Sequence, residues 1–201
     1  AVIMVSGFGG EGFPKASLRA LAKLMLPRVR MLNVYGPTEC TCICSSYEVT
    51  EDDLVSDELL PLGPIAPNFK HWVVDEQGGL VVDGEIGELH LGGPNVGVGY
   101  YRNPEKSMEA FVQNPSHSDY RDICYRTGDL VRYDAERNQL LFCGRMDNQV
   151  KQMGYRIELE EIEYAIGALP YVLENIVLFV KHKEDSGSIV AFVNARQRDE
   201  V

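Results

Sequence analysis

The first 35 residues contain two short apolar runs separated by an amphipathic stretch, a pattern compatible with few folds. The apolar runs cover residues 1–5 and 29–34 and are interpreted as strands, while apolar side chains recur at helical spacing over residues 18–25. A strand, a helix and a strand in so short a segment form a βαβ unit, whose strands are parallel and adjacent. Ligands gather at the carboxyl ends of such strands, so residues 9–11 and 35–39 are expected to share a site.

The middle of the chain, between about residues 52 and 145, has short apolar runs and frequent glycine instead. Three of these runs, residues 71–75, 88–91 and 140–143, are each followed by a glycine-containing turn. This spacing predicts a small antiparallel sheet or a distorted barrel.

A third region begins near Asp147. Apolar residues at helical spacing over residues 159–169 predict a helix, and the runs 176–180 and 189–193 predict two strands joined by a hairpin loop. The predicted fold class is therefore α/β plus β. It comprises a truncated parallel βαβ segment, a small antiparallel β region and an α+β lobe.

The composition excludes several classes of protein. Thirty acidic residues against 19 basic ones give a net charge of −11. Such a charge argues against nucleic-acid binding, which requires clustered basic side chains. No apolar run approaches the roughly 18–20 residues that cross a membrane, and residues 1–5 lack the features of a signal peptide. We therefore expect a cytoplasmic protein with no nucleic-acid or membrane partner.

Five cysteines are present, and three of them alternate as Cys40, Cys42 and Cys44. If this segment is a strand, the alternation places all three side chains on one face. We interpret them as small buried apolar residues. A metal site is the less favoured alternative, because the other two cysteines are isolated in the sequence.

Four motifs, each weak when taken singly, occur in a specific order along the chain. They are N-V-Y-G-P-T-E at residues 33–39, G-E-L-H-L-G-G-P-N-V-G-V-G-Y at 87–100, Y-R-T-G-D-L at 125–130 and G-R-M-D-N-Q-V-K-Q-M-G-Y-R-I-E-L at 144–159. Together they resemble the signature motifs of adenylate-forming (AMP-binding) enzymes. The first and fourth are most similar to those of nonribosomal-peptide adenylation domains and D-alanine–carrier-protein ligases.

The resemblance, which runs from about residue 9 to residue 193, implies a part of a longer enzyme. Residues 1–146 correspond to the end of the large AMP-binding domain, and residues 147–201 to the start of the small C-terminal domain. The family's glycine-rich phosphate loop and its C-terminal catalytic lysine have no counterpart in the sequence. Because such groups supply much of the stabilisation of transition-state charge, we expect the isolated chain to be inactive.

In this family an amino-acid carboxylate attacks the α-phosphate of ATP, and the resemblance implies which residues bind the nucleotide. Tyr35 would stack on adenine, and Asp129 with Arg145 would contact the ribose hydroxyls. Thr38 and Glu39 would be the catalytic residues, with Thr38 at the phosphates and Glu39 as the Mg²⁺ ligand. Without the resemblance, a core tyrosine and a surface salt bridge are the alternative interpretations. The other nucleotide-binding positions that the resemblance implies are Gly10, Glu11, Asn33 and Gly36.

The resemblance also implies a second step, in which the phosphopantetheine thiol of a carrier protein accepts the acyl group. Asp147 occupies the family's hinge position, about which the small domain rotates. Lys151 and Gly154 would face the site in the thioester-forming pose, where a glycine leaves room for the phosphopantetheine arm. A turn glycine is the alternative interpretation of Gly154.

The pocket for the substrate's side chain would be formed by residues of which none is charged, namely Gly7, Gly9, Val34, Cys42 and Ile43. The family's other pocket residues, including the aspartate that holds the α-amino group, have no counterpart in this sequence, so the identity of the amino acid or other carboxylic acid stays open. Two further functions also stay open. The chain could come from an acyl- or aryl-CoA ligase, or be a non-catalytic module that binds a nucleotide or a carrier protein.

Overall fold

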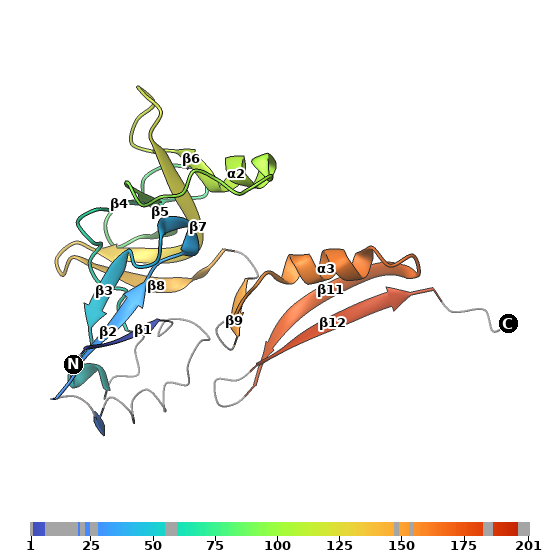
Figure 1. Ribbon diagram of the computed structural model, residues 1–201, viewed down its shortest axis with the longest axis horizontal. Coiled ribbons are helices and arrows are strands. Elements are labelled where there is room, and N and C mark those ends of the chain that lie inside the picture. The colour runs from blue at the N-terminus through green and yellow to red at the C-terminus, as the bar shows by residue number, and fades with distance from the viewer. Residues whose placement is uncertain are drawn as a thin grey trace.

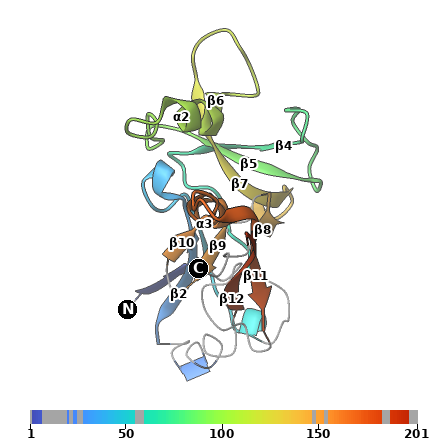
Figure 2. The same ribbon diagram turned by 90° about the vertical axis from the view of Figure 1, so that its right-hand side faces the viewer.

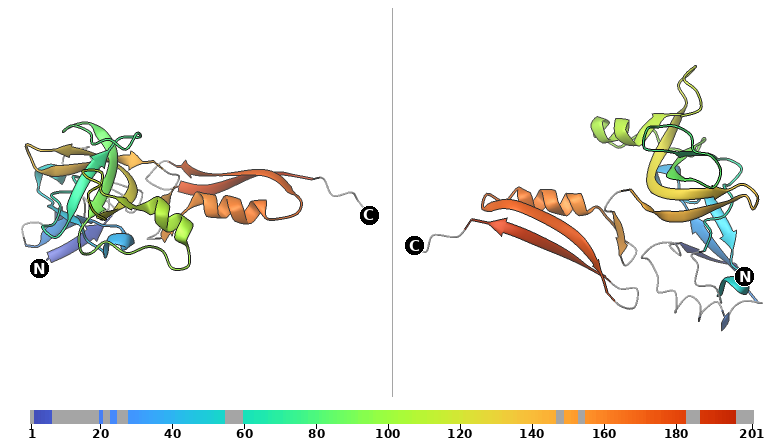
Figure 3. Two further views of the ribbon diagram at one scale, coloured as in Figure 1. Left: turned by 90° about the horizontal axis from the view of Figure 1, so that it is seen from above. Right: turned by 180° about the vertical axis from the view of Figure 1, so that it is seen from behind.

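The protein is seen in a computed structural model that describes residues 2–6, 20, 23–24, 28–54, 60–146, 149–152, 155–182 and 187–196. Figure 1 shows a body that contains a three-stranded and a five-stranded sheet. A separate elongated lobe is formed by the elements from β9 (Val150–Gln152) onward. Both views of Figure 3 show this lobe lying to one side of the body.

The three-stranded sheet consists of β1 (Val2–Ser6), β2 (Arg30–Tyr35) and β3 (Ser45–Glu48), in that order. β1 and β2 run parallel along their whole length, which confirms the parallel pair predicted from the sequence. β3 returns antiparallel along the other side of β2, and the short 3₁₀ helix η2 (Asp52–Leu54) follows it. Most of the predicted connecting helix, residues 18–25, lies outside the described residues.

The five-stranded sheet is built around the long strand β7. Its members are β4 (Lys70–Val74), β5 (Ile86–Gly92), β6 (Phe111–Gln113), β7 (Ile123–Asp134) and β8 (Gln139–Arg145). β5, β6 and β8 pair antiparallel with β7, and β4 pairs antiparallel with β5. The antiparallel region predicted for the middle of the chain is thereby confirmed.

Alternate side chains of β7 face the core of the body. Tyr125, Thr127, Asp129 and Val131 are all buried, at the two-residue period of a strand. The apolar core that they face draws on both sheets: Tyr35, Cys40, Cys44, Leu62, Phe69, Val73, Leu89, Leu91, Tyr125, Val131 and Leu140. Because Thr127 and Asp129 share this buried face, their polar atoms need hydrogen-bond partners within the protein.

Helix α2 (Pro104–Ala110) was not predicted from the sequence. It begins where the Asn103 side chain accepts a hydrogen bond from the Lys106 backbone N–H and Pro104 takes the first helical position. Figure 2 shows α2 beside β6 at one end of the molecule. No helix within the described ranges has the length and apolar character needed to span a membrane.

In its described residues the lobe contains two antiparallel strand pairs and one helix. β9 pairs antiparallel with β10 (Tyr155–Ile157), and β11 (Val172–Lys181) with β12 (Gly187–Ala195). Helix α3 (Leu159–Gly167) lies along the β11–β12 hairpin (Figure 1). The lobe has its own buried cluster, formed by Val150, Leu159 and Val177. The predicted α+β lobe is confirmed, although α3 ends before Leu169.

The strand predicted through the three alternating cysteines is wrong. The segment begins instead as a short 3₁₀ helix, η1 (Thr38–Cys40), and Thr41 and Cys42 follow with φ angles of 57° and 77°. Two successive left-handed residues turn the chain back and are incompatible with a strand. Cys40 and Cys44 are buried as expected, whereas Cys42 is exposed. In the described part of the chain, no group of three or more His, Cys, Asp or Glu side chains could hold a metal.

Candidate active site

A cavity of about 130 Å³ lies where β2 ends, beside β7 and the end of β8. Residues of three separate motifs line it: Tyr35, Gly36, Pro37, Thr38, Tyr125, Thr127, Asp129, Arg145 and Gln149. Five of the residues predicted to bind the nucleotide are among them: Tyr35, Gly36, Thr38, Asp129 and Arg145. The carboxyl end of a strand in a parallel pair is the position expected for a ligand.

Asp129 is the charged centre of this cavity. Its Oδ2 accepts a hydrogen bond from the Tyr35 hydroxyl at 2.5 Å, and its Oδ1 accepts one from Arg145 Nη1 at 2.6 Å. The register of β7 and β8 places Asp129 directly opposite Arg145. The Asp129 and Arg145 side chains are only 10% and 17% exposed. Short charge-assisted bonds shielded from water hold the carboxylate in one orientation.

Burial and the contact with Asp129 together determine the protonation state of the Tyr35 hydroxyl. Burial, the negative charge of Asp129 and the hydrogen bond to it raise the pKa of the Tyr35 hydroxyl well above its ordinary value. Tyr35 therefore stays protonated near neutral pH and acts as a hydrogen-bond donor. Its ring remains available as one wall of the cavity.

The part of β7 that carries Asp129 is anchored to β5. The Thr127 hydroxyl donates a hydrogen bond to the Leu89 carbonyl at 2.8 Å and accepts one from the Asp129 backbone N–H at 3.0 Å. Gly128, whose φ of 71° is a conformation that favours glycine, donates its N–H to Glu88 Oε1 at 3.1 Å. Residues of the motif at 87–100 thus hold the motif at 125–130 in position.

Glu88 can serve as this anchor because it stays ionised. Its Oε2 accepts hydrogen bonds from Arg126 Nε at 3.1 Å and Nη2 at 2.9 Å, and lies 3.3 Å from His90 Nε2. Burial alone would raise the pKa of Glu88. The hydrogen bonds with His90 and Arg126 and the charge of Arg126 outweigh burial and lower the pKa to about 2.

The loop that carries Thr38 and Glu39 is folded tightly on itself. A Cβ atom at Gly36 would lie 1.5 Å from the Cys42 carbonyl oxygen, so only glycine fits there. The Thr41 backbone N–H donates to the Thr38 carbonyl at 3.0 Å and closes the turn. Within this tight loop Thr38 lines the cavity, and Glu39 follows it in η1.

Glu39 is the residue predicted to bind Mg²⁺, and its surroundings suit that ion. In nucleotide sites Mg²⁺ is usually held by one or two carboxylates together with phosphate oxygens and water, rather than by a cage of protein ligands. Glu39 offers one carboxylate next to Thr38, which lines the cavity. The donor set fits Mg²⁺ bound jointly by protein and nucleotide.

A second cavity, of about 280 Å³, adjoins the first and shares Tyr125, Thr127 and Arg145 with it. The first alone is smaller than the roughly 300–1,000 Å³ typical of ligand pockets, so a nucleotide would extend beyond it. Gln149 lines the first cavity and Glu158 the second, and the Gln149 Nε2 group donates to Glu158 Oε1. Neither residue was predicted from the sequence to belong to the site.

Asn33 and three of the predicted substrate-pocket residues, Val34, Cys42 and Ile43, lie in β2 or in the loop that follows it. The Asn33 side chain is buried and its amide donates to the Pro61 carbonyl at 2.8 Å, which ties β2 to the segment that precedes β4. Val34 is buried in β2, while Cys42 and Ile43 are exposed in the loop that follows η1. Their assignment to a substrate pocket stays a prediction.

The remaining predicted site residues come either before β2 or after residue 146 in the sequence. Lys151 belongs to β9, where it pairs with Arg156 of β10. Six predicted residues lie outside the described residues: Gly7, Gly9, Gly10, Glu11, Asp147 and Gly154. The roles given to these residues, including the hinge, stay predictions.

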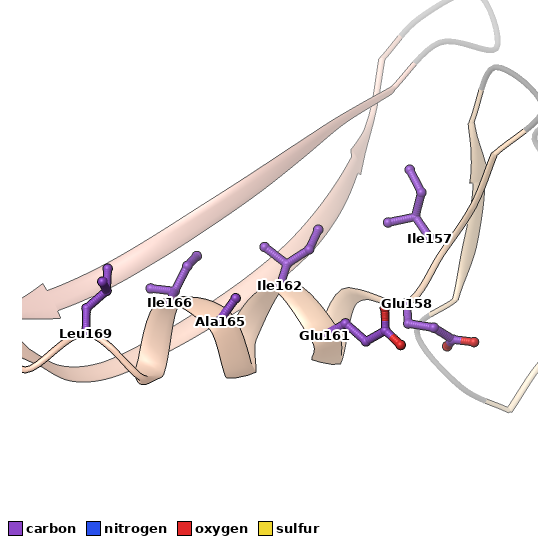
Figure 4. Close-up of a pocket in the computed structure, with 7 residues that line it drawn as sticks. All are labelled: Ile157, Glu158, Glu161, Ile162, Ala165, Ile166 and Leu169. Carbon is purple, nitrogen blue, oxygen red and sulfur yellow. The ribbon is translucent and has the colours of Figure 1, made fainter. Parts of the chain in front are cut away.

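A larger groove, of about 430 Å³, runs along α3 in the lobe. Figure 4 shows Ile162, Ile166 and Leu169 pointing to the same side of the helix, with the carboxylates of Glu158 and Glu161 near its start. The described residues that line this groove include no cation to bind a phosphate. The smaller cavity beside β2 is therefore the candidate site.

Comparison with known proteins identifies the class to which this fold and site belong. The family described as AMP-binding enzyme matches residues 2–101. Malpibaldin synthetase of Mortierella alpina is 40% identical over 198 residues, which cover 96% of this chain and 3% of that protein. D-alanine–D-alanyl carrier protein ligase of Bacillus licheniformis is 39% identical over 193 residues, which cover 96% of this chain and 37% of that protein.

A solved structure gives the same result. Holo-PA1221, described as an NRPS protein containing adenylation and PCP domains bound to a vinylsulfonamide inhibitor, matches with a TM-score of 0.79. It is 28% identical, and the match covers 97% of this chain and 33% of that one. The chain belongs to the family of AMP-binding enzymes, which confirms the resemblance seen in the motifs. It spans 3% and 37% of the lengths of the two curated relatives named above.

Proposed function

We propose that the protein uses ATP to activate a carboxylic acid as an acyl-adenylate. The observation that carries this proposal is the convergence of Tyr35, Asp129 and Arg145, drawn from three distant motifs, on one cavity that also includes Thr38. An aromatic face suits a base, and a carboxylate held in place by a guanidinium suits the two hydroxyls of a ribose. Membership of the AMP-binding family supports the same ligand.

Each residue has a definite task in this proposal. The Tyr35 ring stacks on adenine, while its hydroxyl and Arg145 orient the Asp129 carboxylate toward the ribose hydroxyls. Thr38 donates a hydrogen bond to the α-phosphate, and Glu39 holds Mg²⁺. When bound, Mg²⁺ supplies positive charge that offsets the negative charge of the phosphates. Removal of water from this partly buried site strengthens all of these interactions.

We further propose that the acid is an amino acid and that the acceptor is a carrier-protein phosphopantetheine thiol. The 39% identity to a D-alanyl carrier protein ligase supports both parts. Val34, Cys42 and Ile43 would line the side-chain pocket and suit an uncharged side chain. The chain would divide at Asp147 into a large and a small domain, a division supported by the separate apolar cores of body and lobe.

The first step is tested by substrate-dependent exchange of pyrophosphate into ATP. The intact protein is assayed with the twenty common amino acids and with a set of fatty and aromatic acids. We expect exchange with one or a few uncharged amino acids. Exchange with fatty or aromatic acids alone would favour a CoA ligase, and nucleotide binding without exchange for any acid would favour a non-catalytic module.

The acceptor is tested by following the activated acid, in radiolabelled form, after exchange has identified it. The labelled acid is presented with ATP to a holo-carrier protein and, separately, to coenzyme A. We expect label on the carrier protein that is released by hydroxylamine, as a thioester is. An apo-carrier, which lacks the phosphopantetheine thiol, is the matched control and should remain unlabelled. Transfer to coenzyme A alone would contradict the proposed acceptor.

A further inference from the structure

The segment that ends in Tyr100 crosses the loop that carries Glu39, and three hydrogen bonds join them. The Gly97 backbone N–H donates to the Glu39 carbonyl at 2.7 Å, and Thr41 Oγ1 donates to the Asn95 carbonyl at 2.9 Å. These two bonds fix the backbone around Glu39. The third joins side chains, because the Tyr100 hydroxyl donates to Glu39 Oε1 at 2.7 Å. This third bond sets the direction of the carboxylate.

Tyr100 is itself held in place. Its ring meets that of Phe111 edge to face, with centroids 5.4 Å apart and an interplanar angle of 72°. Its backbone N–H donates to Ser107 Oγ at 2.8 Å, and its carbonyl accepts from the Asn103 N–H at 3.3 Å. With ring and backbone both restrained, the hydroxyl can reach Glu39 only from one side.

We infer that Tyr100 is a positioning residue that orients the Glu39 carboxylate for the Mg²⁺ ion accompanying ATP. This inference rests on the proposed function. A hydrogen bond to one carboxylate oxygen restrains the side-chain torsions of Glu39, so less conformational freedom is lost when the ion binds. Because a phenol is neutral, it orients the carboxylate without cancelling the negative charge, which Lys or Arg in its place would do.

The test replaces Tyr100 by phenylalanine in the intact protein, which keeps the ring contact and removes the hydroxyl. Equilibrium binding of ATP is titrated with Mg²⁺ by calorimetry, and binding of AMP is measured without metal. We expect the Mg²⁺ midpoint to rise several-fold, up to about tenfold, because an unrestrained glutamate side chain loses more conformational freedom when it binds the ion. The metal-free affinity for AMP should not change, because Tyr100 acts on the metal ligand alone.

Two further variants separate positioning from a general effect on structure. Tyr101→Phe is the matched control, since Tyr101 is 86% exposed and contacts Arg102, and it should leave the midpoint unchanged. Glu39→Gln should raise the midpoint, and Tyr100→Phe added to Glu39→Gln should raise it no further. Independent effects would instead add in the double variant and would overturn the inference.

The outcomes also distinguish this inference from the proposed function. An unchanged Mg²⁺ midpoint in Tyr100→Phe overturns the role of Tyr100. An unmodified protein that binds AMP, but whose ATP affinity is independent of Mg²⁺, overturns the inference and leaves the nucleotide site standing. An unmodified protein that binds neither nucleotide overturns both.

Discussion

Replacement of Asp129 by asparagine would remove the negative charge at the centre of the candidate site and keep the size of the side chain. Asp129 accepts hydrogen bonds of 2.5 Å from Tyr35 and 2.6 Å from Arg145, and its side chain is 10% exposed. A hydrogen bond to a charged group contributes about 1.5–3 kcal/mol. If the carboxylate binds the ribose hydroxyls, its loss should weaken AMP binding about 10- to 150-fold.

The assay compares AMP with 2′,3′-dideoxy-AMP in calorimetric titrations of the intact protein. The unmodified protein should bind AMP far more tightly than the dideoxy analogue, and Asp129→Asn should remove most of this difference. Asp134→Asn is the matched control. Asp134 lies on the same strand but pairs with the exposed Arg137 at 3.9 Å and lines neither cavity, so AMP affinity should not change.

Two results would refute the reasoning about Asp129. The first is an Asp129→Asn variant that retains the preference for AMP over the dideoxy analogue. The second is an equal loss of affinity for both ligands. An equal loss indicates damage to the fold around Arg145, which the substitution leaves without its counter-charge. Urea unfolding of the variant measures that damage separately.

Three further predictions concern the residues around the site. Tyr35→Phe should weaken AMP binding about tenfold in calorimetry, because Asp129 loses one orienting donor, and an unchanged affinity would count against it. Gly36→Ala should lower the free energy of unfolding, measured in urea, by about 3 kcal/mol, because the added methyl group meets the Cys42 carbonyl. A loss smaller than about 1 kcal/mol would contradict this close approach. The pKa of Glu88 is lowered from 4.5 to about 2, so its contribution to stability is complete above pH 4.5 and is lost as the pH falls toward 2. That contribution is about 3 kcal/mol, and Glu88→Gln should show a correspondingly smaller loss of stability between pH 5 and pH 2 in urea unfolding.

Most of the strands and the helix of the lobe could be predicted because apolar periodicity is a local signal. The parallel pair at the start of the chain, the antiparallel strands of the middle and the helix of the lobe all follow from such periods. The strand predicted through Cys40 is wrong because Thr41 and Cys42 adopt positive φ angles. Neither residue is glycine, so the sequence gives no sign of this conformation. Helix α2 was missed because its seven residues are fewer than a helical pattern needs to be recognised.

The members of the site could be predicted from the motifs, but their contacts could not. Tyr35 and Asp129 are 94 residues apart and meet only through the packing of two sheets. The pairing of Asp129 with Arg145 depends on the register of β7 and β8, which shifts just beyond it, between Leu130 and Val131. A shift of one residue reverses which face a side chain occupies, and local patterns carry no information about it.

The most direct test of the nucleotide site is a crystal structure of the intact protein with AMP bound. Adenine should lie against the Tyr35 ring, and both ribose hydroxyls should lie within hydrogen-bond distance of Asp129. Thr38 should contact the phosphate. AMP bound with its ribose away from Asp129, or in the groove along α3, would contradict the assignment of the site.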